Sequence, residues 1–72
     1  MDKRTIGLNA GKVWNLLNNN EKWHFEKLKT ALRLNDVELA AAIGWLARED
    51  KVSFVNEDGN SYVCLLLNVY IG

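Results

Sequence analysis

Few side chains in this 72-residue sequence could take part in acid–base or covalent chemistry. His24 is the one histidine, so it is the one candidate for a general base near neutral pH, and Cys64 is the one thiol. A catalytic site needs a nucleophile beside a base, or two carboxylates directed at one point, and neither pattern is present. We therefore expect no enzyme. His24 is expected to cap a helix or stay solvated, and Cys64 to act as a small hydrophobic residue.

The sequence also has few residues that could form a metal, cofactor or phosphate site. His24 and Cys64 are too few soft ligands for a structural zinc, and a lone cysteine makes no internal disulfide. Gly7 and Gly11 lack the following Lys-Ser or Lys-Thr of a phosphate-binding loop. We expect no cofactor and no small-molecule substrate. The sequence also has no signal-peptide core and no apolar run of about 18 residues, which predicts a cytoplasmic protein that does not enter a membrane.

Basic side chains remain as candidates for binding, because they can neutralise phosphates. Nine Lys or Arg balance nine Asp or Glu, but residues 1–35 hold seven of the bases and residues 36–72 hold six of the acids. We predict DNA contacts at Lys27, Lys29, Arg33 and Arg48. The alternative is that these charges form a solvated face.

Spacings of three and four between hydrophobic residues predict helices within one domain that spans residues 1–72. The first helix is expected from about Ile6, capped by Thr5 or Asn9, to the polar run that begins at Asn18. Its expected inward stripe is Ile6, Ala10, Val13, Trp14 and Leu17.

Two further helices are expected after a short extended segment at Trp23–Phe25. The second covers Phe25–Arg33. The third begins at a capping box in which Asn35 is followed three residues later by Glu38, and it ends at the charged cluster that starts at Arg48. Its expected inward stripe is Leu39, Ile43, Leu46 and Ala47.

The hydrophobic period changes to two after Lys51, which predicts a β-hairpin. Strands over residues 51–57 and 60–69 flank Asp58-Gly59, which favours a two-residue type I′ turn because both central residues need positive φ. Pairing Glu57 with Asn60 then places Val52 opposite Leu65. One face is an apolar column expected in the core, formed by Val52, Phe54, Val63, Leu65, Leu67, Val69 and Ile71.

This order of elements is that of a winged helix-turn-helix domain, an α+β fold of three helices, a short strand and a C-terminal two-stranded hairpin. The stretches Asn9–Trp14 and Ala42–Val52 resemble a family of short, stand-alone bacterial winged-helix proteins of unknown function. The resemblance implies the fold, and through the fold a regulator-like DNA-binding role, but no established activity. Arg33 departs from the pattern, since such turns usually carry a glycine with positive φ, so a longer loop or strained backbone is expected there.

The third helix of such a domain lies in the major groove, where its outward side chains contact bases. The outward positions expected here are Asp36, Glu38, Ala41, Ala42, Trp45, Arg48 and Glu49. These residues offer few donors for base edges, and the hairpin tip at Glu57-Asp58 is acidic. Asp36 and Glu38 also have a structural explanation, because acids in a first helical turn stabilise the helix. The fold favours DNA, whereas this surface favours a protein-interaction module.

The second face of the hairpin is unusually apolar, since residues 62–67 are apolar on both faces. One layer of helices covers only one face of a sheet, so a second copy of the chain is expected to cover the other. We predict a homodimer whose interface contains Trp45, Val55, Tyr62, Leu66 and Tyr70. The alternative for Trp45 is that it folds back over the hairpin as part of the core.

Overall fold

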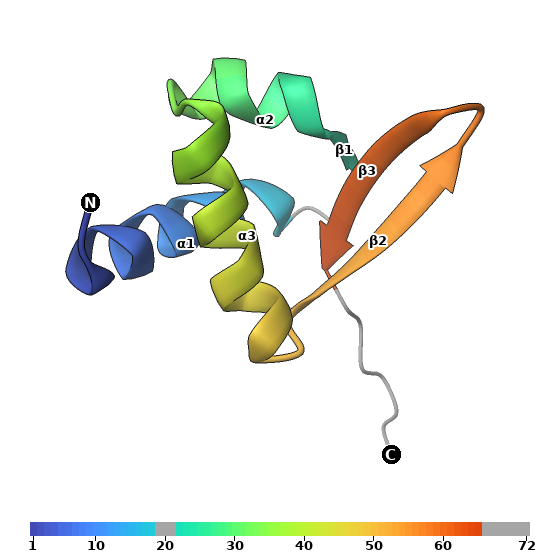
Figure 1. Cartoon of the computed structure of the whole chain (residues 1–72). Helices are drawn as coiled ribbons and strands as arrows, with labels where there is room; N and C mark the ends of the chain where they lie inside the picture. The colour runs from blue at the N-terminus through green and yellow to red at the C-terminus, as the bar shows by residue number, and fades with distance from the viewer. Residues whose placement is uncertain (19–21, 66–72) are drawn as a thin grey trace.

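The computed structural model describes residues 1–18 and 22–65, which form three helices and a three-stranded antiparallel sheet. In chain order the elements are α1 (Lys3–Leu17), β1 (Trp23–His24), α2 (Phe25–Leu32), α3 (Asp36–Arg48), β2 (Val52–Glu57) and β3 (Asn60–Leu65). The helices form one group, from which the hairpin of β2 and β3 extends (Figure 1). The predicted winged helix-turn-helix order is confirmed. None of these helices is both long and apolar enough to cross a bilayer.

Side-chain caps determine where the helices begin. The predicted cap of α1 at Thr5 or Asn9 is wrong, because Asp2 lies in an extended conformation and its Oδ1 accepts from the backbone N–H of Thr5 at 2.8 Å. His24 caps α2 through a side-chain acceptor, as expected for one of its two roles. The predicted capping box of α3 is present, with both reciprocal hydrogen bonds formed between Asn35 and Glu38.

The turn between α2 and α3 contains the strained backbone expected at Arg33. Arg33 adopts the left-handed conformation, with φ 57° and ψ 43°, and ends α2 one residue earlier than predicted. Its N–H donates to Thr30 O at 3.4 Å, and the N–H of Leu34 donates to Lys29 O at 3.1 Å. The turn therefore has the hydrogen bonds of a helix C-cap without the glycine that usually supplies them.

The hairpin has the predicted register, from Val52 opposite Leu65 to Glu57 opposite Asn60. Asp58 and Gly59 have φ of 51° and 79°, as a type I′ turn requires. β1 adds a third strand, with Trp23 opposite Val63 and His24 opposite Tyr62, so the sheet order is β1-β3-β2. The predicted extension of the second strand beyond Leu65 lies outside the described residues.

The core lies between the helices and the inner face of the sheet. It consists of Ala10, Val13, Leu17, Leu28, Leu39, Ala42, Ile43, Leu46, Val52 and Val63. Three expectations about burial are wrong. Trp14 and Phe54, expected inside, are 39% and 54% exposed, and Ala42, expected outside, is fully buried. Periodicity predicts the side on which a residue lies, but the neighbouring elements decide whether that side is covered there.

Candidate functional site

The outward face of α3 is the first candidate, because a winged helix-turn-helix domain contacts bases with this surface. Val37, Ala40, Gly44 and Arg48 follow one another at helical spacing and are all exposed, Val37 at 64%. Of these four residues, only Arg48 has a side chain that can hydrogen-bond a base edge. A Cβ added at Gly44 would meet nothing within 4 Å, so the middle of this face is open and smooth.

Lys29, a predicted DNA contact, forms ion pairs with two acidic side chains of its own chain. Its Nζ lies 2.6 Å from Asp36 Oδ1 and 3.1 Å from Glu26 Oε1, and its side chain is 25% exposed. The hydrogen bond to Asp36 raises the pKa of Lys29, and the one to Glu26 adds to the shift. Lys29 thus joins α2 to the first turn of α3. Its positive charge is already neutralised by these carboxylates, which weakens its attraction for a phosphate.

The other predicted DNA contacts are exposed and come from two helices. Lys27 lines a depression beside β1, Arg33 lies at the turn between α2 and α3, and Arg48 ends α3. At about 1.5 Å per residue, Arg48 is roughly 18 Å along α3 from Asp36 at the other end of the helix. The structure therefore brings Lys29 together with acids and places Arg48 at the far end of α3 from its first turn.

The outer face of the sheet, which the apolar pattern assigned to a dimer interface, is partly covered by the chain itself. Val55 and Tyr62 are half-buried. The ring of His24 meets Tyr62 edge-on at 5.4 Å between centroids, and Lys22 Nζ lies 5.0 Å from the Tyr62 ring centroid. Lys22 also contacts Glu57 Oε1 at 2.5 Å, and this hydrogen bond raises the pKa of Lys22. Lys22 and His24 therefore cover part of the outer face of the sheet that we expected a second copy of the chain to cover.

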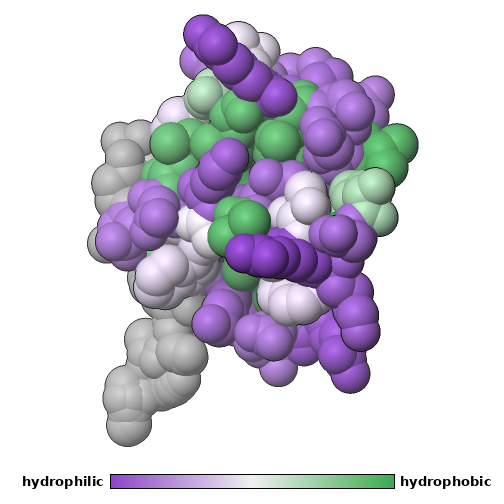
Figure 2. Space-filling model, turned by 90° about the vertical axis from the view of Figure 1, so that its left-hand side faces the viewer, coloured by the Kyte–Doolittle hydropathy of each residue, from purple (hydrophilic) through white to green (hydrophobic). Residues whose placement is uncertain are grey.

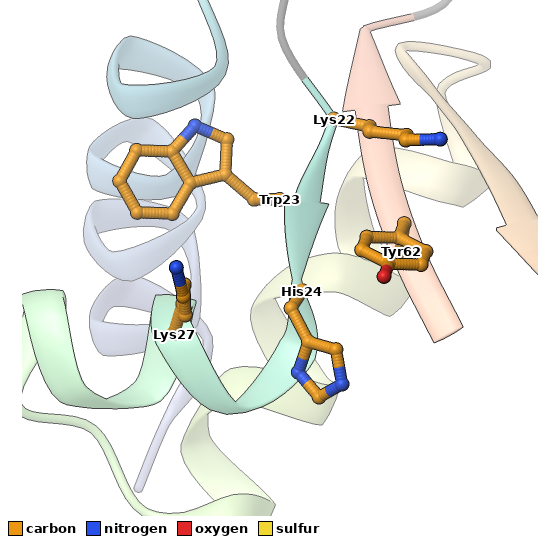
Figure 3. Close-up of a pocket in the computed structure, with 5 residues that line it drawn as sticks. All are labelled: Lys22, Trp23, His24, Lys27 and Tyr62. Carbon is orange, nitrogen blue, oxygen red and sulfur yellow. The ribbon is translucent and has the colours of Figure 1, made fainter. Parts of the chain in front are cut away.

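A depression of about 330 Å³ adjoins this arrangement, lined by Lys22, Trp23, His24, Lys27 and Tyr62. In Figure 3, Trp23 and Lys27 lie on one side of β1, and Lys22 and Tyr62 lie on the other. The side chains surround the strand and do not converge on a common point. This depression accordingly lacks the arrangement of polar groups that would orient a small ligand.

His24 and Cys64 have structural surroundings. His24 Nδ1 accepts from the backbone N–H of Glu26 at 3.1 Å, and Nε2 lies 3.3 Å from Asn60 Oδ1. Cys64 is half-buried, with its Sγ 3.9 Å from the carbonyl oxygen of Ser53. Within residues 1–18 and 22–65, no three His, Cys, Asp or Glu side chains are grouped so that they could hold a metal ion.

Large hydrophobic side chains are exposed on the helices as well as on the hairpin. On the face formed by the left-hand side of Figure 1, Figure 2 shows hydrophobic residues mostly in the upper half of the view, with hydrophilic residues among them. Over the described residues the large exposed hydrophobics are Met1, Leu8, Trp14, Val37, Trp45 and Phe54. Trp45 is 38% exposed and lies against α1, since a Cβ added at Gly7 would be 3.7 Å from its ring. Trp45 therefore packs on a helix and not over the hairpin.

The predicted dimer residues thus belong to different surfaces. Trp45 lies on the helices, Val55 and Tyr62 lie on the outer face of the sheet, and Leu66 and Tyr70 are outside the described residues. The sequence reasoning missed Phe54 as a surface residue. Its position on a strand that leads to an acidic turn, away from the helices, was the signal that it would lie beyond their cover.

Known proteins share both the sequence and this geometry. Residues 1–65 match a family described as winged helix-turn-helix domain (DUF2582). The uncharacterized protein MJ1608 of Methanocaldococcus jannaschii is 43% identical over 63 residues, which cover 85% of this chain and 89% of that protein. The solution NMR structure of protein BT2368 from Bacteroides thetaiotaomicron superposes with a TM-score of 0.80 at 38% identity, covering 90% of this chain and 79% of that one. The chain therefore belongs to this family of winged helix-turn-helix domains, whose function is unknown.

Proposed function

We propose that this domain acts by binding protein, and in the first place a second copy of itself. The observation that carries the proposal is the outward face of α3, where Val37, Ala40 and Gly44 occupy the positions that would face the bases of DNA. These side chains can neither donate to nor accept from a base edge. A smooth apolar helix face is suited to contact with another apolar surface.

The electrostatics of the same region support this proposal. Asp36 lies at the end of α3 that helix-turn-helix proteins bring to the bases, and its carboxylate would face a polyanion. Lys29 compensates this charge, so the pair together adds no net attraction for phosphate. The turn of the hairpin carries Asp58 and follows Glu57, with no cation in β2 or β3. Neither part offers the basic surface on which nonspecific affinity for DNA depends.

Self-association also accounts for the exposed hydrophobic residues. Leu8, Val37 and Phe54 are each more than half exposed in a chain of 72 residues. Single exposed residues of this kind are normal on a surface, whereas contiguous patches mark sites of interaction, so these residues support the proposal through the apolar face of α3 to which Val37 belongs. The small size of the domain strengthens the argument, because a chain this short buries only about 60% of its unfolded surface and gains stability from a partner.

Analytical ultracentrifugation tests the proposal directly. We expect the sedimenting mass to rise toward that of two chains as the protein concentration increases from the micromolar to the millimolar range. Val37→Ala and Leu8→Ala, both at exposed positions, serve as variants that report whether the helix surface takes part. A monomer throughout this range would refute the proposal.

DNA binding is the second candidate, favoured by the fold and by the exposed side chains of Lys27, Arg33 and Arg48. Fluorescence anisotropy with a labelled random duplex at low salt distinguishes the two. DNA binding predicts a dissociation constant below about 10⁻⁴ M that rises steeply with added salt. The protein-interaction proposal predicts weaker binding than this, and no change in the oligomeric state when duplex is added.

A further inference from the structure

We infer that two copies of the chain pair through the free edge of β2, in antiparallel orientation about a two-fold axis at Phe54. This inference rests on the proposed self-association and places the contact between the two copies on β2, a different element from the apolar face of α3. Two three-stranded sheets, each in the order β1-β3-β2, would become one continuous sheet with the two β2 strands at its centre. The occupant of the edge is thus a second copy of β2, Val52–Glu57.

The free edge of β2 lacks the features that usually prevent an edge strand from pairing with another strand. It lies at the end of the sheet, and its second edge has no strand partner among residues 1–18 and 22–65. Natural edge strands are usually protected by lysine, proline, a bulge or a covering element. The sequence of β2, VSFVNE, contains neither lysine nor proline, and its ladder with β3 runs through six consecutive pairs without a bulge. An edge of this kind is a template for another strand.

The hairpin geometry determines which backbone groups point outward. In a two-residue hairpin the pair beside the turn, Glu57 with Asn60, exchanges both backbone hydrogen bonds, and hydrogen-bonded and non-hydrogen-bonded pairs then alternate. The groups of β2 not used by β3 therefore belong to Val52, Phe54 and Asn56. These three residues carry the N–H and C=O groups that a second strand can bind.

One register uses all of these groups. When Phe54 lies opposite Phe54 of the second copy, Val52 lies opposite Asn56 in both directions, and each of the three pairs can exchange two hydrogen bonds, about six in total. A shift by two residues in either direction leaves one outward residue of each strand without a partner. A two-fold axis at Phe54 is therefore the arrangement that forms the most backbone hydrogen bonds along this edge. Because both β2 edges are then paired, this contact gives a dimer and no larger assembly.

The side chains agree with this register. Phe54 is 54% exposed, and the two rings would meet across the axis as a cross-strand aromatic pair. The same register places Lys51 opposite Glu57 of the second copy at both ends of the paired strands. The Lys51 and Glu57 side chains are 50% and 49% exposed. Each also has a partner within its own chain, Glu49 for Lys51 at 3.9 Å and Lys22 for Glu57, so the contact between copies would be shared with these ion pairs. Parallel pairing would instead place like charges side by side.

Disulfide trapping tests the register in the full chain. In a Cys64→Ser background, Phe54→Cys places two cysteines across the axis, where the Cα atoms of a hydrogen-bonded pair are about 5.5 Å apart and within disulfide range. Asn56→Cys is the matched control on the same edge, because four residues of offset separate its two copies by about 14 Å. We expect a covalent dimer with Phe54→Cys under mild oxidation and at most a trace with Asn56→Cys.

Charge reversal tests the same register without removing the Phe54 ring. Lys51→Glu should raise the dissociation constant of the dimer about fivefold, because each of two exposed ion pairs is worth roughly 0.5 kcal/mol. Adding Glu57→Lys to Lys51→Glu should restore part of the lost affinity, because Glu57→Lys also removes the Lys22–Glu57 ion pair within each chain. Asp58→Lys, which changes a neighbouring charge outside the paired strands, provides the control for a general effect of net charge.

The outcomes separate this inference from the proposed function. A chain that stays monomeric overturns both. A dimer that forms without the Phe54→Cys disulfide, or that forms it equally with Asn56→Cys, overturns the β2 pairing and leaves self-association intact. A dimer whose affinity is the same in Lys51→Glu and the double variant also overturns it.

Discussion

The backbone at Arg33 gives the most direct prediction about stability. Arg33 holds φ 57° and ψ 43°, a conformation that costs a residue with a Cβ about 1–2 kcal/mol and costs glycine almost nothing. Replacing Arg33 by Gly removes this cost but adds about 0.4–1 kcal/mol of chain entropy to the unfolded state. We therefore expect Arg33→Gly to raise the free energy of unfolding by about 0.5–1 kcal/mol.

Urea denaturation measures this difference, with Arg33→Ala as the matched control. Both variants lose an exposed guanidinium, but alanine keeps the strained left-handed backbone. For a domain of this size, 1 kcal/mol corresponds to a shift in Tm of about 4–8 °C, so the expected gain is readily measured. If Arg33→Gly is no more stable than Arg33→Ala, the backbone at this position is not strained and the reasoning is refuted.

Two further predictions concern the helix caps. Asn35→Ala should lower the free energy of unfolding by about 1 kcal/mol in the same urea assay, because the capping box with Glu38 loses its side-chain acceptor, whereas Asn35→Asp should retain most of it. The hydrogen bond from the Thr5 N–H lowers the pKa of the Asp2 carboxyl below its ordinary value of 3.8. The stability that this cap contributes is therefore present above pH 3.8 and is lost as the pH falls through the pKa of the folded state. A pH series of thermal unfolding should show a shallower loss of stability below that pH for Asp2→Asn, and an identical slope would contradict the role of this cap.

The elements that the sequence predicted most closely depend on local chemistry. Asp58-Gly59 specifies a two-residue turn, and once the turn is placed the alternation of side chains determines every pair from Val52 to Leu65. Asn35 and Glu38 likewise define the start of α3 through bonds that span only three residues. Such signals need no knowledge of the rest of the fold.

The features that the sequence did not predict depend on contacts between distant segments. β1 has two residues, and its pairing with β3 joins His24 to Tyr62 across 38 positions of the chain, beyond the reach of any periodicity. Trp14 and Phe54 lie on sides that should be buried but extend past the elements that would cover them. The sequence predicts too late a start for α1 because Gly7 weakens the helix locally, whereas in the fold this glycine lies beside the Trp45 ring.

The charge pattern shows the same limit at the candidate site. Counting bases in residues 1–35 suggested a surface for phosphates, but two of those bases are paired across elements, Lys22 with Glu57 and Lys29 with Asp36. Both acids come from the acidic half of the chain. Two of the seven bases of residues 1–35 therefore form ion pairs within the molecule, which join the residue before β1 to the hairpin and α2 to α3.

Arg33 is where stability and function can be separated. Three residues other than glycine have positive φ in the described chain, and two of them, Asp50 and Asp58, belong to a residue type that tolerates this conformation. Arginine is not such a residue, so the strained backbone at the helix-turn-helix corner raises the hypothesis that the exposed guanidinium has a role there. If that role is contact with DNA, Arg33→Gly and Arg33→Ala should lose duplex affinity equally while only the former gains stability. If duplex affinity is unchanged in both, Arg33 gives no support to the DNA candidate, and the proposal of protein contact then rests on the sedimentation experiment.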